Sequence, residues 1–299
     1  MIYRVEDRWL HIDISSLFVK TIQEFFDSYI PSKKVQHLLI QNKHILLDGN
    51  PVKREDDIIG LELDICIYPE TYSYESVSLK PDIVYEDELF LIVNKPKDVL
   101  VHSDGNEETT LVDIVASYFG DGSFYSANPL HRLDRETSGL VVFSKSVVFQ
   151  PLLDKLMSEK QIRREYLAFV EGRMTPGTSM NIDKPIGKDR HNANRRVIYK
   201  GGQSALTRVR CLACNKAKEY SILLCTLDTG RTHQIRVHLS SIGHPILNDP
   251  LYGDKSDLCI RMGLFARTVE FYHPLKEDSL SIEAELPNDL GRLYQAGLK

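Results

Sequence analysis

One short stretch of the chain, residues 131–140, has the side chains needed for acid–base or nucleophilic chemistry (HRLDRETSGL). Its carboxylate, Asp134, lies between Arg132 and Arg135 and just before an apolar run. Positive charges within about 4–6 Å keep a carboxylate ionised. An ionised Asp134 suits a nucleophile or general base, although a structural aspartate that caps a turn with Thr137 fits the same residues.

A second candidate segment, 230–238, reads GRTHQIRVH and gathers four donors or bases. Gly230 allows a tight turn that could aim Arg231 into a cleft. A basic amphipathic helix or strand is the alternative. His233 and His238 lack the spacing and the companion glutamate of a zinc-protease pair, so the sequence predicts no metal site here.

A third segment, 164–168, reads REYLA and is expected to be a strand. Tyr166 beside Arg164 could stack on a nucleic-acid base, an interaction of about 1–3 kcal/mol. Tyrosines on strands also commonly serve only to pack.

The charge of the chain is unevenly distributed. The 299 residues carry a net charge of −5, yet residues 160–236 hold 16 Lys and Arg against 6 Asp and Glu. The remainder holds 21 basic against 36 acidic residues. The basic quarter indicates either a surface that faces a polyanion or a solvated, loop-rich face.

Composition also bounds the class of protein. The length predicts about two domains of roughly 100–200 residues each. No run approaches about 18 consecutive apolar residues, and residues 1–10 lack the apolar core of a secretory signal, so we expect a cytoplasmic protein. The five cysteines are scattered and do not suggest disulfides. Cys211 and Cys214 have CxxC spacing without a second ligand pair, which favours a structural role.

The pattern along the chain predicts four parts. Residues 1–20 alternate like an appended strand or arm, and 21–70 form a small unit with two helices and an Asp-Gly hairpin. Residues 71–81 are a linker, and 82–299 form the main domain. There, helices are expected at 111–119 and 149–159 and strands at 140–143, 166–171, 207–212 and 220–227, with 175–202 as a loop. The irregular alternation predicts an α+β fold with a mixed sheet.

Taken in order, these segments resemble the RluA-type pseudouridine synthases. The segment around Asp134 is similar to that family's catalytic signature, 164–168 to its second motif and 230–238 to its third. Asn94-Lys95-Pro96 with Val101-His102 matches the opening motif, and residues 243–253 continue the match. The resemblance covers about 82–275 and implies a central sheet that is mostly antiparallel, flanked by helices and loops. Asp98 and Asn248 stand where the family usually has glycine.

Residues 21–70 resemble, more loosely, an S4-type RNA-binding domain. The segments 32–34 (SKK), 38–40 (LLI) and 47–52 (LDGNPV) fall where that domain has its basic helix and its strand-turn-strand. Against RNA binding by this unit, residues 1–80 carry 9 basic and 13 acidic residues.

The resemblance implies a mechanism without a cofactor or metal. Asp134 would act on a uridine flipped out of its stack, which costs a few kcal/mol. Arg231 would pair with Asp134, Tyr166 would stack on the base, and Arg132 would enter the RNA helix or contact phosphates. The other expected RNA contacts are His131, Arg135, Arg164, His233 and Arg236.

We therefore expect a monomeric RNA pseudouridine synthase that acts on large-subunit ribosomal RNA, with transfer RNA as the alternative substrate. A non-catalytic RNA-binding or ribosome-assembly protein is a second alternative. A glycoside hydrolase would need two carboxylates about 5–9.5 Å apart, and only Glu136 lies near Asp134 in sequence.

Overall fold

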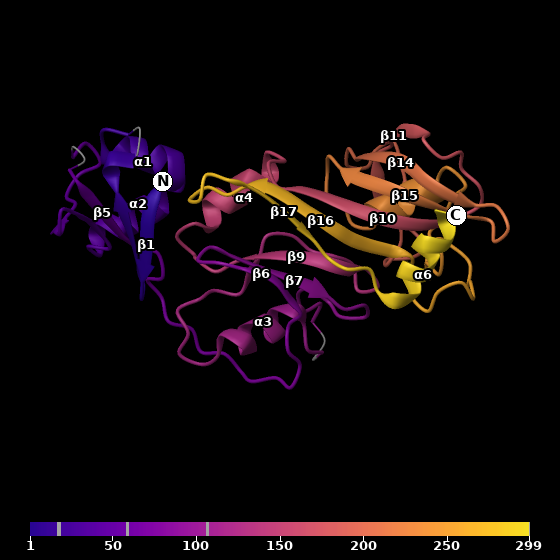
Figure 1. Ribbon diagram of the computed structural model, residues 1–299, viewed down its shortest axis with the longest axis horizontal. Helices are drawn as coiled ribbons and strands as arrows, with labels where there is room; N and C mark the ends of the chain where they lie inside the picture. The colour runs from indigo at the N-terminus through magenta and orange to yellow at the C-terminus, as the bar shows by residue number, and fades with distance from the viewer. Residues whose placement is uncertain (17–18, 58–59, 106–107, 299) are drawn as a thin grey trace.

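The computed structural model describes residues 1–16, 19–57, 60–105 and 108–298. It has two units, each with its own sheet: a small N-terminal unit and a large C-terminal unit (Figure 1). No helix in the described part of the chain has the length and apolarity needed to cross a membrane.

The N-terminal unit is a five-stranded sheet covered by helices α1 and α2. Residues 1–20, expected as an arm, contribute a hairpin whose second strand pairs antiparallel with β5. The hairpin and the 21–70 unit therefore share one sheet. The elements, with the strands in spatial order, are β1 (Ile2–Glu6), β2 (Trp9–Asp13), β5 (Glu62–Cys66), β3 (Ile45–Leu47), β4 (Asn50–Pro51), α1 (Ile22–Tyr29) and α2 (Lys33–Gln41).

Local signals explain these elements. Thr21 caps α1 by accepting a hydrogen bond from the backbone N–H of Glu24 at 3.2 Å. The hairpin between β3 and β4 turns at Asp48 and Gly49, which both have positive φ angles (47° and 75°). This is the geometry for which an Asp-Gly pair is suited.

The large unit contains a ten-stranded sheet with α3 (Leu111–Phe119) and α4 (Gln150–Ser158) close to their expected bounds. The sheet confirms the α+β class, because among the described pairs only β9 and β16 run parallel. The strand order is β11 (Ser179–Asp183), β14 (Leu206–Asn215), β15 (Tyr220–Leu227), β10 (Arg163–Glu171), β16 (Leu264–Tyr272), β9 (Ser138–Ser144), β7 (Phe90–Lys95) and β6 (Ile83–Glu86), with β17 (Ser279–Glu283) on β16 and β8 (Asn128–Pro129) on β9.

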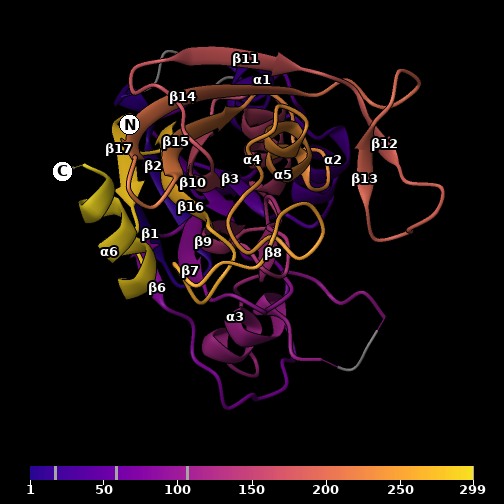
Figure 2. The ribbon, with the colours of Figure 1, turned by 90° about the vertical axis from the view of Figure 1, so that its right-hand side faces the viewer.

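The expectation of a loop at 175–202 was wrong. This stretch contains β11 and a separate hairpin of β12 (Ile186–Lys188) and β13 (Arg196–Ile198), which projects from the body (Figure 2). These strands are short and lie at an edge or outside the main sheet, so they bury few side chains. β12 and β13 are three residues each, too short to show an alternating apolar pattern, and the alternation in β11 is limited to Met180 and Ile182.

A glycine joins the two halves of the large sheet. Gly139 has a φ of 116° and pairs in parallel with Ala266 on β16. A Cβ atom at this position would lie 2.2 Å from the carbonyl oxygen of Ala266. Only glycine therefore lets β16 approach β9 directly after the turn that carries Asp134.

The two units pack directly against each other. The Oγ of Ser146 donates a 2.6 Å hydrogen bond to the carbonyl of Ile67, and the Tyr68 and Tyr125 rings meet edge to face at 5.0 Å. One buried apolar cluster includes residues of both units. The N-terminal unit therefore packs against the end of the large unit where α4 lies (Figure 1).

Candidate active site

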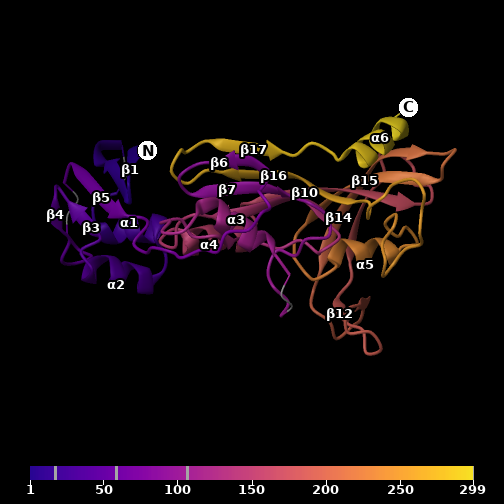
Figure 3. The ribbon, with the colours of Figure 1, turned by 90° about the horizontal axis from the view of Figure 1, so that it is seen from below.

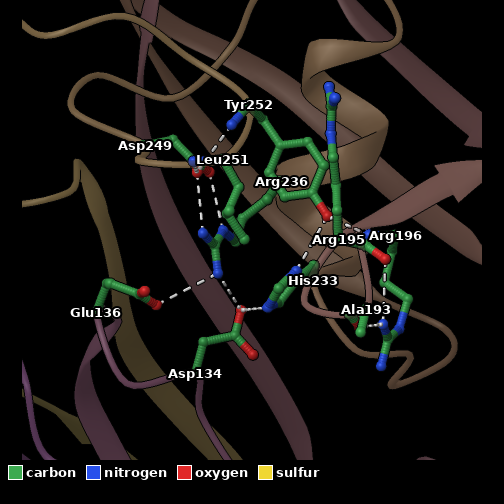
Figure 4. Close-up of polar contacts among 10 residues, drawn as sticks. All are labelled: Asp134, Glu136, Ala193, Arg195, Arg196, His233, Arg236, Asp249, Leu251 and Tyr252. Carbon is green, nitrogen blue, oxygen red and sulfur yellow. Dashed lines mark hydrogen bonds and ion pairs between the residues drawn. The ribbon is translucent and has the colours of Figure 1, made fainter. Parts of the chain in front are cut away.

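A buried arginine connects the acidic side chains of three residues. Arg236 lies in α5 (Gln234–Ser240), and its side chain has no exposed surface. Its Nε and Nη2 donate to the two oxygens of Asp249 at 2.8 and 2.9 Å. Its Nη1 donates to Asp134 at 3.1 Å and to Glu136 at 3.4 Å (Figure 4). The planar fork of the guanidinium thus fixes the position of Asp134.

The surrounding carboxylates keep this arginine charged. Burial alone would lower the pKa of Arg236, but the hydrogen bonds and charge of Asp249, together with the charges of Asp134 and Glu136, raise it well above its ordinary value. Asp134 therefore faces a permanent cation.

Arg231 does not make the ion pair expected of it. Its side chain is exposed, and its Nε donates to the carbonyl of Ser204 at 3.1 Å. Arg236 is the residue that pairs with Asp134. The cause is the start of α5 at Gln234, which leaves Arg231 in the preceding turn and places Arg236 inside. Arg236 has no exposed side-chain surface, and its expected contact with RNA stays a prediction.

Asp249 is fully engaged in holding Arg236. Its Oδ1 also accepts hydrogen bonds from the backbone N–H groups of Leu251 at 2.9 Å and Tyr252 at 3.2 Å. Asn248 precedes it with a φ of 57°, where the family usually has glycine. Asp249 is buried and bonded on both oxygens, so it is not placed to serve as the second carboxylate of a hydrolase.

A buried lysine supports the loop that carries Asp134 from the other side. The Nζ of Lys95 donates to the carbonyls of Pro96, Val99 and Arg135 at 2.9, 2.7 and 3.1 Å. Burial lowers the pKa of Lys95 to about 8. The backbone N–H of Asp98, with a φ of 66°, donates to the same Arg135 carbonyl at 2.8 Å. Asp98, like Asn248, therefore has a left-handed backbone conformation at a position where the family usually has glycine.

Asp134 and Tyr166 line one small pocket. Tyr166 lies on β10 and is 3% exposed. Burial raises the pKa of its hydroxyl, the charge of Arg164 opposes that shift, and the charge of Asp134 adds to it, so the hydroxyl stays protonated. The other residues around this pocket are Arg132, Leu133, Thr137, Leu227, Arg231, His233, Gln234, Ile235, Arg236 and Leu264.

His233 forms one wall of the pocket. It has a φ of 57° at the start of α5, and its Nε2 lies 3.9 Å from Oδ2 of Asp134. Its Nδ1 lies 3.0 Å from the Tyr252 hydroxyl, which accepts a hydrogen bond from the backbone N–H of Arg196 at 2.7 Å (Figure 4). Burial lowers the pKa of His233, so a neutral ring faces Asp134.

The remaining expected RNA contacts differ in position. Arg132 is exposed at the pocket, and Arg135 is paired with Glu108. Arg164 is partly buried, and its Nη2 lies beside Gly230, 3.9 Å from where a Cβ atom of that residue would be.

The ring nitrogens of His131 face the protein. Its Nε2 lies 3.3 Å from the backbone N–H of Val142, and its Nδ1 is buried without a partner among the described residues. Burial holds its pKa well below the ordinary value, so the ring is neutral. The residue as a whole is only partly buried, and its expected contact with RNA stays a prediction.

Several residues that shape the site were not predicted from the sequence. Gln234 accepts hydrogen bonds from Thr229 at 2.7 Å and from the N–H of Arg231 at 3.0 Å, and it donates to Thr207 at 3.0 Å. Asp249 and Lys95 lie within two of the motifs, but their spacing in the sequence does not predict what their side chains bond.

A group of potential metal ligands in the described part of the chain lies away from this pocket. His11, Glu62 and Asp64, on β2 and β5, have ligand atoms within 4.8 Å of one another. The Nδ1 of His11 already bonds Asp64 at 2.7 Å, and Arg4 lies 3.8 Å from Glu62.

Comparison with known proteins gives the family. Residues 89–241 match RNA pseudouridylate synthase. The chain is 34% identical over 266 residues to the "Uncharacterized RNA pseudouridine synthase YhcT" of Bacillus subtilis (strain 168), covering 87% of this chain and 85% of that protein. It is 31% identical over 296 residues to the ribosomal large subunit pseudouridine synthase D of Escherichia coli (strain K12), covering 92% and 89%. The chain therefore belongs to the RNA pseudouridine synthase family and is an isomerase that acts on RNA.

Solved structures agree on the fold. The human RNA pseudouridylate synthase domain containing 1 superposes with a TM-score of 0.56 at 25% identity, over 73% of this chain and 94% of that one. The human RNA pseudouridylate synthase domain containing 4 gives 0.57 at 22% identity, over 72% and 92%. The expected pseudouridine synthase fold is thus confirmed.

Proposed function

We propose that this enzyme isomerises a flipped uridine in large-subunit ribosomal RNA with Asp134 as its catalytic carboxylate. The observation that carries the proposal is the position of Asp134: its side chain is 19% exposed in a pocket and bonded to the fully buried Arg236. The carboxylate can reach a substrate, while the buried guanidinium behind it holds it in position.

Tyr166 supplies the second feature that the chemistry needs. In the reaction the N1–C1′ glycosidic bond breaks, a C5–C1′ bond forms, the proton on C5 leaves and N1 gains a proton. The base must therefore be held while it turns. A protonated tyrosine that shares the pocket with Asp134 offers a face on which the uracil stacks.

The proposed RNA rests on the relatives. Proteins named ribosomal large subunit pseudouridine synthase D match at 31–34% identity over most of the chain. The N-terminal unit, which we take as S4-like, has two helices against a sheet and a tight Asp48-Gly49 turn. The expectation of a monomer in the cytoplasm stays a prediction.

The test is an activity and binding assay of Asp134→Asn on unmodified ribosomal RNA transcripts. We expect pseudouridine formation to fall by more than about a hundredfold, with RNA affinity within about twofold of wild type. Asp27→Asn, an exposed change on α1, is the control and should keep full activity. An active Asp134→Asn enzyme would overturn the assignment. Mapping pseudouridines in a deletion strain decides the RNA: sites lost from transfer RNA alone would refute the ribosomal substrate.

A further inference from the structure

Arg231 lies where three hollows of the large unit meet. It lines the pocket of Asp134, a groove beside the end of α4 and a hollow beside the β12–β13 hairpin. We call the second the α4 groove and the third the hairpin hollow. Because Arg236 has taken the ion pair with Asp134, the guanidinium of Arg231 is exposed and free of any acidic partner in the described part of the chain.

The α4 groove is strongly basic. It has a volume of about 470 Å³, and its other cationic residues are Lys160, Arg163, Arg164 and Arg208. Its acidic residue, Asp228, is already bonded by Arg208 at 2.7 and 3.0 Å. Within the described ranges no carboxylate lies within 4.0 Å of the side-chain nitrogens of Lys160 or Arg163, which are both exposed. These two cations are therefore available to an anionic ligand.

The hairpin hollow is basic as well. Lys188 on β12 and Arg196 on β13 are register partners and line it together with Arg231. Its floor includes Gly202, where a Cβ atom would lie 2.4 Å from the backbone of Ile186, and no acidic side chain is among its lining residues. The hairpin projects from the body beside α5 (Figures 2 and 3). Lys188 and Arg231, which line the hollow, are exposed and can be reached by a ligand from outside.

We propose that one strand of the RNA crosses the molecule at Arg231, with the target uridine turned into the Asp134 pocket and its neighbouring phosphates bound on the two sides. Arg231 binds a phosphate beside the flipped nucleotide. Lys160 and Arg163 bind phosphates in the α4 groove, and Lys188 and Arg196 bind phosphates in the hairpin hollow. This path rests on the proposed function, because it takes the pocket of Asp134 as the place of the reacting base.

The geometry follows from what base flipping requires. A flipped nucleotide keeps its backbone at the mouth of the pocket, so the flanking phosphates must leave in two directions. Two basic hollows that meet at one exposed arginine provide those directions. RNA is favoured over an acidic protein because both basic hollows share Arg231 with the pocket that contains Asp134 and Tyr166.

The experiment measures binding of an unmodified ribosomal RNA transcript at 50 to 300 mM KCl. The full-length variants are Arg163→Gln, Lys188→Gln, Arg231→Gln and the control Arg173→Gln. Arg173 belongs to the same basic segment but follows the far end of β10, where it pairs with Glu219. Each phosphate contact contributes about 0.7–0.9 to the slope of log affinity against log salt. We expect Arg163→Gln, Lys188→Gln and Arg231→Gln each to lose about that much slope and to bind RNA about 3–10 times more weakly at 100 mM salt. Arg173→Gln should match wild type, and all variants should keep the wild-type melting temperature.

The path would be overturned if Arg163→Gln, Lys188→Gln and Arg231→Gln kept the wild-type slope, or if Arg173→Gln lost as much slope as they do. Poly-glutamate that competes as well as RNA, at equal charge, would show a general anion surface and also refute it. The activity of Asp134→Asn separates this proposal from the previous one. An active Asp134→Asn enzyme with altered slopes in the groove variants refutes the catalytic assignment and leaves the RNA path standing.

Discussion

The active site and the N-terminal unit use charged residues in opposite ways. In the active site, Arg236 and Asp249 are both fully buried and hold each other at 2.8 Å. In the N-terminal unit, pairs such as Arg4 with Glu6 and Arg54 with Asp56 are more than half exposed. Buried pairs demand strict geometry, and removing one partner costs about 3–5 kcal/mol, whereas exposed pairs contribute about 0–1 kcal/mol. The buried charges hold the side chains of the active site in position, whereas the exposed charges of the N-terminal unit only keep its surface hydrated.

Replacing the buried arginine should have the largest effect. Arg236→Met removes the cation from Asp134 and leaves Asp249 buried without its partner. We expect a loss of about 3–5 kcal/mol in the free energy of unfolding and a fall in pseudouridine formation of more than about a hundredfold. Denaturant titration and a tritium-release assay measure the two effects. Arg54→Met is the matched exposed control and should change stability by less than about 1 kcal/mol. Equal losses of stability in Arg236→Met and Arg54→Met would contradict the distinction between buried and exposed ion pairs.

The buried lysine should give the site a pH dependence that exposed lysines lack. Lys95 has a pKa of about 8 in the folded chain against an ordinary value of 10.5, so between these values the unfolded chain binds more protons. The contribution of Lys95 to stability therefore rises as the pH increases from about 8 to 10. We expect the stability difference between wild type and Lys95→Met to shift in favour of wild type over this window. The steepest change should be about 1.4 kcal/mol per pH unit. A constant difference, measured by denaturant titration at several pH values, would contradict the buried, partly neutral amine.

Arg231→Gln should have a smaller effect, of a different kind. Since Arg231 is exposed and does not bond Asp134, we expect kcat to stay within about threefold of wild type while KM for RNA rises. Steady-state kinetics on one transcript, with Arg236→Gln alongside, compare the two arginines of the same motif. If Arg231→Gln lost kcat as severely as Arg236→Gln, Arg231 would belong to the chemistry after all.

Changes on the basic helix of the N-terminal unit should have the smallest effect. Lys33 and Lys34 are exposed at the start of α2, in a region where acidic residues outnumber basic ones. Lys33→Ala with Lys34→Ala should alter RNA affinity by less than about twofold and stability by less than about 0.5 kcal/mol. Filter binding at low salt measures the affinity. A loss above about fivefold would make this unit an RNA contact and weaken the comparison.

The sequence predicted elements whose information is local. The helix at 111–119 has an apolar face and begins after Thr110, which forms a reciprocal capping box with Asp113. The strand at 220–227 is apolar because it lies inside the large sheet. Both patterns can be recognised without any knowledge of distant contacts.

The choice between two arginines could not be made in this way. Whether Arg231 or Arg236 faces Asp134 depends on where α5 begins. That start is held by the hydrogen bond from Gln234 to Thr207 on strand β14. His233 also adopts a left-handed conformation there, which its residue type does not demand. The buried partner Asp249 likewise becomes visible only after the chain has folded.

Gly139 has a further consequence for when the enzyme becomes active. Asp134 and Arg236 are 102 residues apart. Asp134 lies just before β9 and Arg236 lies in α5, which follows β15, and β9 and β15 belong to the two halves of the sheet that meet where β16 lies against Gly139. A growing chain leaves the ribosome from its N-terminus, and contacts of such long range form late. Until β16 has emerged, the aspartate has no complete fold around it. We expect the nascent polypeptide to be inactive until β16, residues Leu264–Tyr272, has left the ribosome and can pair with Gly139.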